Sequence, residues 1–255
     1  MFIDTHCHIS KNDYENPEEI IKHMDGNIMI ISGADPKDLE EIIYLCESHS
    51  NIFTTIGIHP EFASTYTKED LDNLEKYLTH PKVVGIGEVG LDYHYTKENI
   101  NEQKDLFIKQ INLANKYNKT LVIHCRDAME DTYNILKQYK DKNTKLDFHC
   151  YSGDEIMGKK LLEMGATFGI GGILTFKNDK RLKKVVKSLP IESFVFETDS
   201  PYLTPEPLRG HQNEPANIKY TAKYMAELLD MDINKLYEIT TKTAIRQFDL
   251  ENKLC

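Results

Sequence analysis

Histidine and carboxylate side chains stand at the ends of several short apolar runs in this sequence. The first run ends in DTHCH at residues 4–8, and the spacing of its two histidines puts both imidazoles on one face of a strand. Imidazole and carboxylate groups together suit divalent ions such as zinc, manganese or iron. The pattern therefore indicates a metal centre, for which six residues are candidate ligands: His6, His8, Glu88, His124, His149 and Asp199.

Other interpretations exist for each of these residues taken singly. An isolated His-x-His is common, and a single acidic residue at a strand end is often the N-cap of the next helix. Six metal-competent residues at five strand ends are better explained by metal binding. Cys7, Cys125 and Cys150 each adjoin a candidate ligand, but strand alternation turns them to the opposite face. We therefore expect these thiols to pack against helices as small apolar groups.

Alternating strand and helix patterns run from one end of the chain to the other. The apolar runs recur every 21 to 37 residues, about the size of a βα unit. They begin near Phe2, Asn27, Ile52, Val83, Thr120, Lys145, Ala166 and Phe194. Helical patterns lie between them, over 36–49 and over 99–117, where Gln103, Phe107, Ile111 and Ala114 share one face. Another helix is expected to open with the Ser152 hydroxyl as its cap and to stop at Gly165.

Eight strands, each followed by a helix, predict an α/β fold of the (β/α)8 TIM-type barrel class, with residues 1–255 as a single domain. An open doubly wound sheet is the alternative, but the first strand is followed by no G-x-G-x-x-G turn. In a barrel, the carboxyl ends of the strands meet on one face, where such folds build active sites. That face is where the candidate ligands would converge.

Composition excludes several classes of protein. Lysine and arginine total 31 against 41 acidic residues, a formal charge of −10, which argues against a general electrostatic coat for nucleic acid but not against a local basic patch. No run approaches the roughly 18 apolar residues of a membrane span, and the first residues do not resemble a signal peptide. The five scattered cysteines suit reduced thiols. We expect a cytoplasmic protein, with no membrane association and no obligate protein partner.

Five segments resemble the signature blocks of the TatD family, whose members are metal-dependent hydrolases of the amidohydrolase superfamily and include several deoxyribonucleases. These are FIDTHCH at 2–8, GIGEVGLD at 85–92, IHCR at 123–126, HCYSG at 149–153 and ETDSPYL at 197–203. The resemblance runs in order from Phe2 to about Phe248. One departure is Thr243, which stands where the family usually has an asparagine before Ala244.

The resemblance implies two divalent metal cations per monomer, with zinc, manganese or magnesium as candidates. His6, His8 and Asp199 would hold the first ion, and His124 and His149 the second. Glu88 would bridge the two ions, in the place where many members of the superfamily have a carbamylated lysine. This partition of the ligands comes from the resemblance alone.

The implied reaction is the attack of a metal-activated water on a phosphodiester, with Asp199 and Glu88 as the catalytic residues. Asp199 would orient the water and take its proton. Asp4 and Glu197 each precede a candidate ligand by two residues on the same strand face. They are expected to fix imidazole tautomers, and the alternative is that they are buried structural carboxylates.

Four further residues are expected to bind substrate. His59 and Glu61 lie in another family-like segment, residues 57–61. The chain has 27 lysines and four arginines, so the choice of Arg126 and Arg209 near strand ends suggests a planar fork that grips phosphate. The alternative is that these arginines pair with Asp92 or Glu214.

DNA is the expected substrate, cut from a strand end. A basic run over 177–187 is interpreted mainly as a solvated helix face, so binding to duplex DNA is expected to be weak. The alternative function is hydrolysis of a small amide, lactone or carboxylic ester by the same metal centre. A non-catalytic scaffold is a third class, which the intact ligand set argues against.

Overall fold

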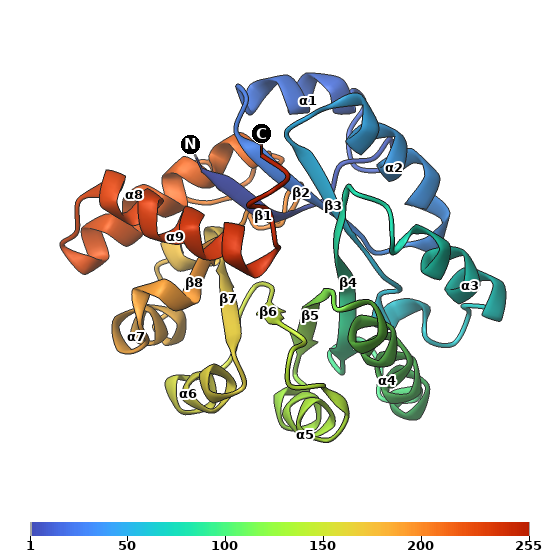
Figure 1. Ribbon diagram of the computed structural model, residues 1–255. Coiled ribbons are helices and arrows are strands. Elements are labelled where there is room, and N and C mark those ends of the chain that lie inside the picture. Colours follow the sequence, from blue (N-terminus) through green and yellow to red (C-terminus); the bar gives the residue numbers. More distant parts are fainter. Residues whose placement is uncertain (1, 255) are drawn as a thin grey trace.

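Each predicted apolar run forms a strand, and the strands lie side by side in chain order (Figure 1). The structure is a computed structural model that describes residues 2–254, and in it every strand pairs in parallel with the next. The strands start within one residue of the predicted positions. They are β1 (Ile3–Cys7), β2 (Ile28–Gly33), β3 (Ile52–Ile56), β4 (Val83–Asp92), β5 (Thr120–Arg126), β6 (Leu146–Phe148), β7 (Ala166–Ile170) and β8 (Phe194–Phe196).

Backbone hydrogen bonds beyond the end of β8 bring the last strand back to the first. The amide of Asp199 donates to the carbonyl of His6 at 2.9 Å, and the amide of His8 donates to the carbonyl of Ser200 at 2.7 Å. The result is a nearly closed barrel, so the predicted (β/α)8 fold is confirmed. The closure also sets the segment after β8 directly beside the two histidines of β1.

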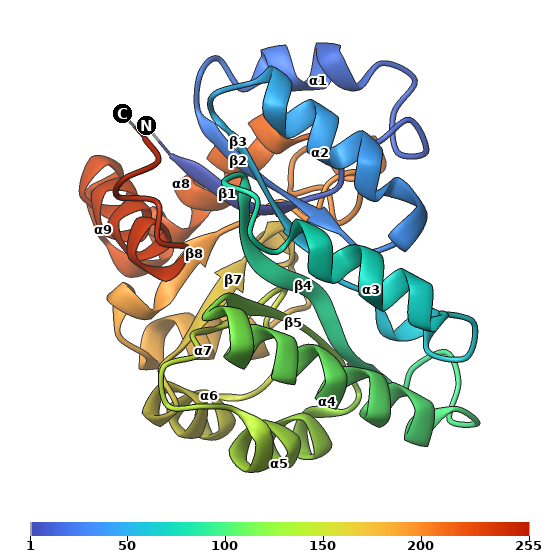
Figure 2. The same cartoon turned by 45° about the vertical axis from the view of Figure 1, so that its right-hand side comes forward.

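Helices surround the strands, as Figures 1 and 2 show from two directions. They are α1 (Pro17–His23), α2 (Leu39–Ser48), α3 (Lys68–Tyr77), α4 (Ile100–Tyr117), α5 (Met129–Tyr139), α6 (Glu155–Glu163), α7 (Arg181–Ser188), α8 (Ile218–Leu229) and α9 (Ile233–Gln247). Short 3-10 turns are η1 (Pro36–Asp38), η2 (Pro60–Phe62), η3 (Gly172–Thr175), η4 (Ile191–Ser193) and η5 (Pro215–Asn217). Among residues 2–254, none of these helices combines the length and apolar character needed to cross a lipid bilayer.

The helix predictions are confirmed in position and corrected in detail. The predicted inward face of α4 is fully or almost fully buried. The segment 36–49 divides into η1 and α2, because Asp35 caps the 3-10 turn by accepting from the Lys37 amide. At the start of α6 the cap is Asp154, which accepts from the Met157 amide at 2.8 Å. The predicted cap, Ser152, lies too far from the helix start, and its hydroxyl donates to the Cys125 carbonyl instead.

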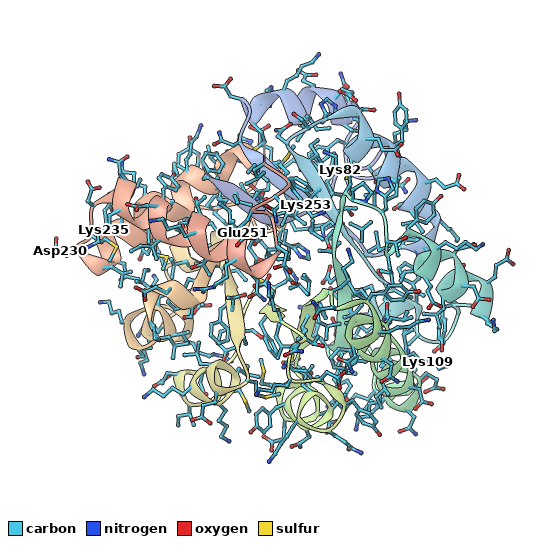
Figure 3. All side chains as sticks on the ribbon, viewed as in Figure 1. Lys82, Lys109, Asp230, Lys235, Glu251 and Lys253 are labelled. Atoms are coloured by element: carbon cyan, nitrogen blue, oxygen red, sulfur yellow. The ribbon has the colours of Figure 1, made fainter. Side chains whose placement is uncertain are left out.

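Two apolar layers hold the barrel together. Residues such as Phe107 of α4 and Ile123 of β5 fill the space between strands and helices. Inside the barrel, Phe53 and Val122 pack with Phe248, which follows α9 and closes the end where the strands begin. Figure 3 shows Lys82, Glu251 and Lys253 grouped at the centre of the view, on the side where the termini lie. With this end closed by packing, the carboxyl ends of the strands are left to form a pocket.

Candidate metal centre

The carboxylate of Glu88 is the centre of the site, and its two oxygens face different imidazoles. Glu88 lies within β4 and is 4% exposed. Its Oε2 atom lies 3.4 Å from His6 Nε2 and 3.7 Å from His8 Nε2. Its Oε1 atom lies 2.7 Å from His124 Nδ1 and 3.2 Å from His149 Nε2. The histidines are therefore divided into two pairs, one for each oxygen of a single carboxylate.

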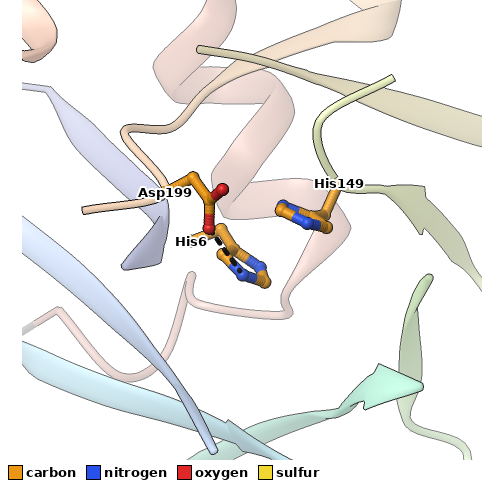
Figure 4. Close-up of side chains that lie close together, drawn as sticks. All are labelled: His6, His149 and Asp199. Atoms are coloured by element: carbon orange, nitrogen blue, oxygen red, sulfur yellow. Dashed lines mark ion pairs between the residues drawn. The ribbon is translucent and has the colours of Figure 1, made fainter. Parts of the chain in front are cut away.

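Asp199 joins the pair from β1. Its Oδ1 atom lies 3.4 Å from His8 Nε2 and 3.8 Å from His6 Nε2. Figure 4 shows His6, Asp199 and His149 around one space, and the rings of His6 and His149 stack with their centroids 3.8 Å apart. Asp199 has a positive φ of 53°, a left-handed backbone that aspartate tolerates better than most residues. This turn after β8 presents the carboxylate to the first pair of histidines.

Buried imidazole nitrogens without hydrogen-bond partners indicate that the site suits a cation. His6 is fully buried, and within residues 2–254 neither of its ring nitrogens makes a hydrogen bond. A buried polar group without a partner is costly, and coordination of a cation removes that cost. Three groups of donor atoms lie within 4.8 Å of one another: His6–His149–Asp199, His6–His8–Glu88 and His59–Glu88–His124. The residues present therefore fit divalent ions held by nitrogen and oxygen donors.

Neighbouring charges shift the pKa values of the buried carboxylates and imidazoles in this site. Burial alone would raise the pKa of Glu88, but the surrounding histidines hold this pKa well below its usual value. Burial opposes protonation of His8 as well, yet Asp199 and Glu88 raise its pKa to about 9. Burial and the neighbouring His149 instead lower the pKa of His6. The carboxylates are thus held ionised, as ligands for a cation must be.

His59 belongs to this cluster, although the sequence did not indicate it as a candidate ligand. It follows β3, and its Nε2 atom lies 3.6 Å from Glu88 Oε1. Its ring stands edge-on to His124, with the centroids 4.5 Å apart. Glu61, two residues later, donates its amide to His59 Nδ1, and its exposed carboxylate lies on the wall of the pocket. Both residues lie where they could reach a substrate, and His59 could also hold an ion.

Asp92 is a site residue that the sequence analysis considered only as a partner for Arg126. Strand β4 continues for four residues past Glu88, so Asp92 lies near the same face. Its Oδ2 atom accepts a hydrogen bond from His124 Nε2 at 2.9 Å, and its Oδ1 atom accepts from the His94 amide at 2.8 Å. Burial favours the neutral acid, but these hydrogen bonds lower the pKa of Asp92. From the sequence, Asp92 could have been found as a site residue because it is an acidic residue four positions after Glu88 in the same apolar run.

The two carboxylates expected to fix imidazole tautomers differ in the structure. Asp4 accepts from the hydroxyl of Thr198 at 2.6 Å and from the amides of Thr198 and His6, and no imidazole within residues 2–254 hydrogen-bonds to it. Asp4 is thus a structural carboxylate, which corrects the expected role. Glu197 accepts from the Cys150 amide at 2.6 Å, and the same oxygen lies 3.6 Å from His149 Nδ1.

A glycine makes room for Glu197. A Cβ atom at Gly169, on β7, would lie 2.1 Å from Glu197 Oε2, a distance that no side chain allows. The absence of a side chain on β7 therefore lets this carboxylate lie inside the barrel, against the His149 loop. Glu197 is the one of the two carboxylates that keeps the predicted position beside a candidate ligand.

The candidate ligands lie in a pocket of about 720 Å³ at the carboxyl ends of the strands, which we call the metal pocket. Arg126 is on its wall, with the guanidinium carbon 5.0 Å from the centre of the Tyr95 ring and Nη1 donating to the Tyr95 hydroxyl. Arg209 is not among the residues that line this pocket. Its guanidinium carbon lies 3.8 Å from the centre of the Phe176 ring, a cation–π contact. The role of Arg209 in binding substrate stays a prediction.

The cysteine predictions have mixed outcomes. Cys7 is fully buried in an apolar cluster, as expected. Cys125 contacts Thr132 of α5 through its sulfur, although part of it also lines the pocket. Cys150 contradicts the alternation argument, because β6 already ends at Phe148 and Cys150 has a left-handed φ of 45°. Cys150 is one of the residues that line the pocket. The fifth cysteine, Cys255, lies outside the described residues.

Comparison with known proteins places this geometry in a family. The family model described as TatD related DNase matches residues 3–249. The metal-dependent hydrolase YabD of Bacillus subtilis is 38% identical over 97% of this chain and 99% of its own length. The metal-dependent hydrolase YcfH of Escherichia coli is 32% identical over 98% and 97%. The chain belongs to the TatD family of metal-dependent hydrolases.

Solved structures share the fold. The TatD homologue YjjV of Escherichia coli superposes with a TM-score of 0.89 at 22% identity, covering 97% of this chain and 98% of its own. The TatD-family hydrolase of Entamoeba histolytica has a TM-score of 0.82 at 23% identity, covering 97% of each chain. At this level of identity the likeness concerns the fold.

Proposed function

We propose that this hydrolase is a deoxyribonuclease that cuts phosphodiester bonds at the ends of DNA strands with the help of two divalent cations. The observation that carries the proposal is the division of ligands around Glu88. One oxygen faces His6 and His8, and the other faces His124 and His149. A carboxylate with imidazoles on both oxygens is suited to bridge two ions.

The side chains have distinct parts in this reaction. Bound divalent ions would activate a water molecule and stabilise the charge that develops on a phosphoryl group. Asp199 would orient that water and accept its proton. Burial disfavours the ionised form of Asp199, but the hydrogen bond with His8 and the nearby histidines lower its pKa, so the carboxylate is ready to accept. Asp92 would hold the ring of His124, and Glu197 that of His149.

The shape of the pocket supports action at a chain end. Its volume of about 720 Å³ is in the range of pockets that enclose a small molecule, which suits one or two nucleotides. The opposite end of the barrel is closed by Phe248 and its neighbours, so a strand cannot pass through. A terminal nucleotide could enter from the open face and bring its phosphodiester to the cluster around Glu88.

Hydrolysis of a small uncharged amide, lactone or ester is the second candidate function. The observation that favours it is the charge of the pocket wall, where Asp13, Asp35, Asp38 and Glu61 outnumber Arg126, the one lysine or arginine that the described residues contribute. Such a wall would suit a neutral or cationic substrate. Bound divalent ions would offset this charge near the cluster, which keeps phosphodiesters the better candidate.

A substrate panel tests the choice. Metal-loaded protein is incubated with end-labelled single- and double-stranded DNA, with bis(p-nitrophenyl) phosphate, and with uncharged p-nitrophenyl esters and lactones. We expect cleavage of the phosphodiesters and stepwise shortening of the labelled strands. Asp199→Asn, prepared in the same way, excludes a contaminating nuclease, and Lys187→Gln on the outer side of α7 serves as the matched control. Turnover of esters or lactones without any phosphodiester cleavage would overturn the proposal.

A further inference from the structure

A second groove adjoins the metal pocket and shares Cys125, Arg126 and Ser152 with it. The groove has a volume of about 1070 Å³ and lies over the first turns of α5 and α6. Arg181, the first residue of α7, also lines it. A molecule that is too long for the metal pocket could therefore continue into this groove without leaving the protein surface.

Two of the four arginines in the chain line this groove, against one of its 27 lysines. Arg181 donates through Nη1 to the Ser152 carbonyl at 3.0 Å, and the Ser152 hydroxyl donates to the Cys125 carbonyl at 3.2 Å. These bonds hold Arg181 against the loop after β6, while Arg126 is held by Tyr95. Each guanidinium has five N–H donors, so both keep several for a ligand. Fixed arginines of this kind are suited to phosphate groups.

The other charged groups of the groove are partly engaged already. Three carboxylates line it. Asp127 Oδ2 lies 3.1 Å from His94 Nδ1, and Asp154 caps the N-terminus of α6. Glu130 lies in the first turn of α5. Lys160 adds a third cation and lies over the Tyr133 ring. The groove thus offers cations in fixed positions without the one-sided acidity of the metal pocket.

Exposed apolar side chains accompany these cations. Tyr95 is 80% exposed, lines the metal pocket and stacks on the guanidinium of Arg126. Ile156 is 65% exposed and lines the groove. An exposed aromatic ring beside a phosphate-binding cation is the arrangement by which proteins hold unpaired bases, because every base can stack on an aromatic face. Paired bases in a duplex are not available for such stacking.

The opposite side of the metal pocket repels anions. Asp35 and Asp38 lie between β2 and α2, and Asp13 lies after β1, all on the pocket wall. Burial and the neighbouring Asp35 and Asp13 carboxylates raise the pKa of Asp38, which reflects their crowding. A polyanion is therefore directed away from β2 and toward Arg126 and Arg181. The pocket has a side suited to an end without phosphates and a side suited to the rest of the chain.

We propose that the Arg126–Arg181 groove binds the single-stranded polynucleotide that continues from the scissile bond, with both arginines on its phosphates and Tyr95 against one of its bases. This inference rests on the proposed phosphodiesterase function. It adds that single strands are preferred to duplexes, and that catalysis improves when the substrate is long enough to reach Arg181.

Binding can be measured separately from cleavage. The fluorescence anisotropy of a labelled single-stranded 10-mer is followed on metal-free protein at several salt concentrations. Arg181→Gln should weaken binding about tenfold and make the salt dependence shallower by about one phosphate contact. Lys187→Gln, an exposed position on the same helix outside the groove, is the matched control and should change neither. Equal binding by wild-type protein and Arg181→Gln would overturn the inference.

Cleavage supplies the second test. On the 10-mer, kcat/KM should fall about tenfold in Arg181→Gln and partly recover in Arg181→Lys, while kcat/KM on bis(p-nitrophenyl) phosphate stays unchanged. Equal losses on both substrates would show that Arg181 supports the loop fold, and would overturn the inference. If wild-type protein cleaves neither substrate, the proposed function fails, and the anisotropy measurement still decides whether the groove binds a single strand.

Discussion

The carboxylate of Asp92 accepts a hydrogen bond from His124 Nε2 at 2.9 Å and thereby turns the other ring nitrogen toward Glu88. Burial opposes protonation of His124, but Asp92 and Glu88 raise its pKa, because each ring nitrogen faces one of these carboxylates. A cation bound beside Glu88 would displace the proton from Nδ1, while the ionised carboxylate of Asp92, which can only accept, would keep the proton on Nε2. Asp92 thus selects the ring nitrogen of His124 that is available to a metal ion.

Asp92→Asn should weaken metal binding at the His124 side of the cluster by about 10- to 100-fold. The amide can donate to Nε2, which would move the ring proton to Nδ1 and remove the lone pair. Competition with a chromophoric chelator measures the two affinities. Asp127→Asn, an exposed carboxylate near His94, is the control. Retention of both affinities in Asp92→Asn would show that another contact sets the tautomer.

We expect about two ions per monomer in purified wild-type protein, and one or none in Glu88→Gln. The substitution keeps the shape of the side chain but removes the charge that serves both groups of histidines. Elemental analysis after dialysis gives the metal content, and thermal unfolding shows whether the variant is folded. Two ions bound at wild-type affinity would exclude a bridging role for Glu88.

Asp199→Asn should fold normally and lose activity by about 100-fold or more, the size expected when a proton acceptor is removed. Asparagine tolerates the left-handed backbone at this position, so the turn after β8 is preserved. Metal content is measured beside kcat, because Asp199 is also a candidate ligand. Near wild-type turnover would transfer the role of proton acceptor to His59 or Glu61.

Asp147 should make stability depend on pH. This residue of β6 is fully buried, and within residues 2–254 its Oδ2 atom has no hydrogen-bond partner. Burial raises its pKa to about 7, against about 4 in an unfolded chain. The folded state therefore keeps a proton that the unfolded state loses, so the free energy of unfolding falls as the pH rises from about 4 to 7. Above pH 7 this contribution is constant.

Asp147→Asn cannot titrate at this position and provides the comparison. Urea unfolding of both metal-free proteins between pH 4 and 8 should show the wild type losing stability relative to the variant as pH rises. The loss should amount to a few kcal/mol at most, because one unit of pKa corresponds to about 1.4 kcal/mol. Parallel curves for the two proteins would mean that folding does not raise the pKa of Asp147.

The sequence predicted the strands well because each is a short run of β-branched and apolar residues between polar turns. The candidate ligands at their ends followed from the same runs. Residues beyond the strand ends were less predictable, since alternation no longer applies once the backbone turns. Cys150 reaches the pocket through a left-handed residue, and Arg209 lies on Phe176, a contact between segments 33 residues apart. Neither geometry has a local sequence pattern.

The roles of buried carboxylates were also beyond sequence reasoning. Asp4 and Glu197 occupy equivalent positions before a ligand, and only the structure distinguishes them. Thr198 satisfies Asp4, whereas the space above Gly169 leaves Glu197 free to approach His149. Such differences depend on which side chain a neighbouring segment places next to the carboxylate inside the barrel.

Helix α4 pairs with two strand ends through the side-chain amides of two glutamines. Gln110 accepts from the Ile58 amide at 2.7 Å and donates to the Ile58 carbonyl, and Gln103 does the same for Asp92. The two glutamines lie seven residues apart, which is close to two helical turns, so they share one face of α4.

One helix therefore acts as a spacer between the loop that carries His59 and the end of β4 at Asp92. The amides of Ile58 and Asp92 should exchange with solvent as slowly as those of the strands, although they lie at the edge of the pocket. Residues 94–98, which carry Tyr95, are exposed and lack such a clamp among the described residues. The amides of this exposed segment should therefore exchange faster than those of Ile58 and Asp92, whose hydrogen bonds to α4 fix the spacing of the two strand ends.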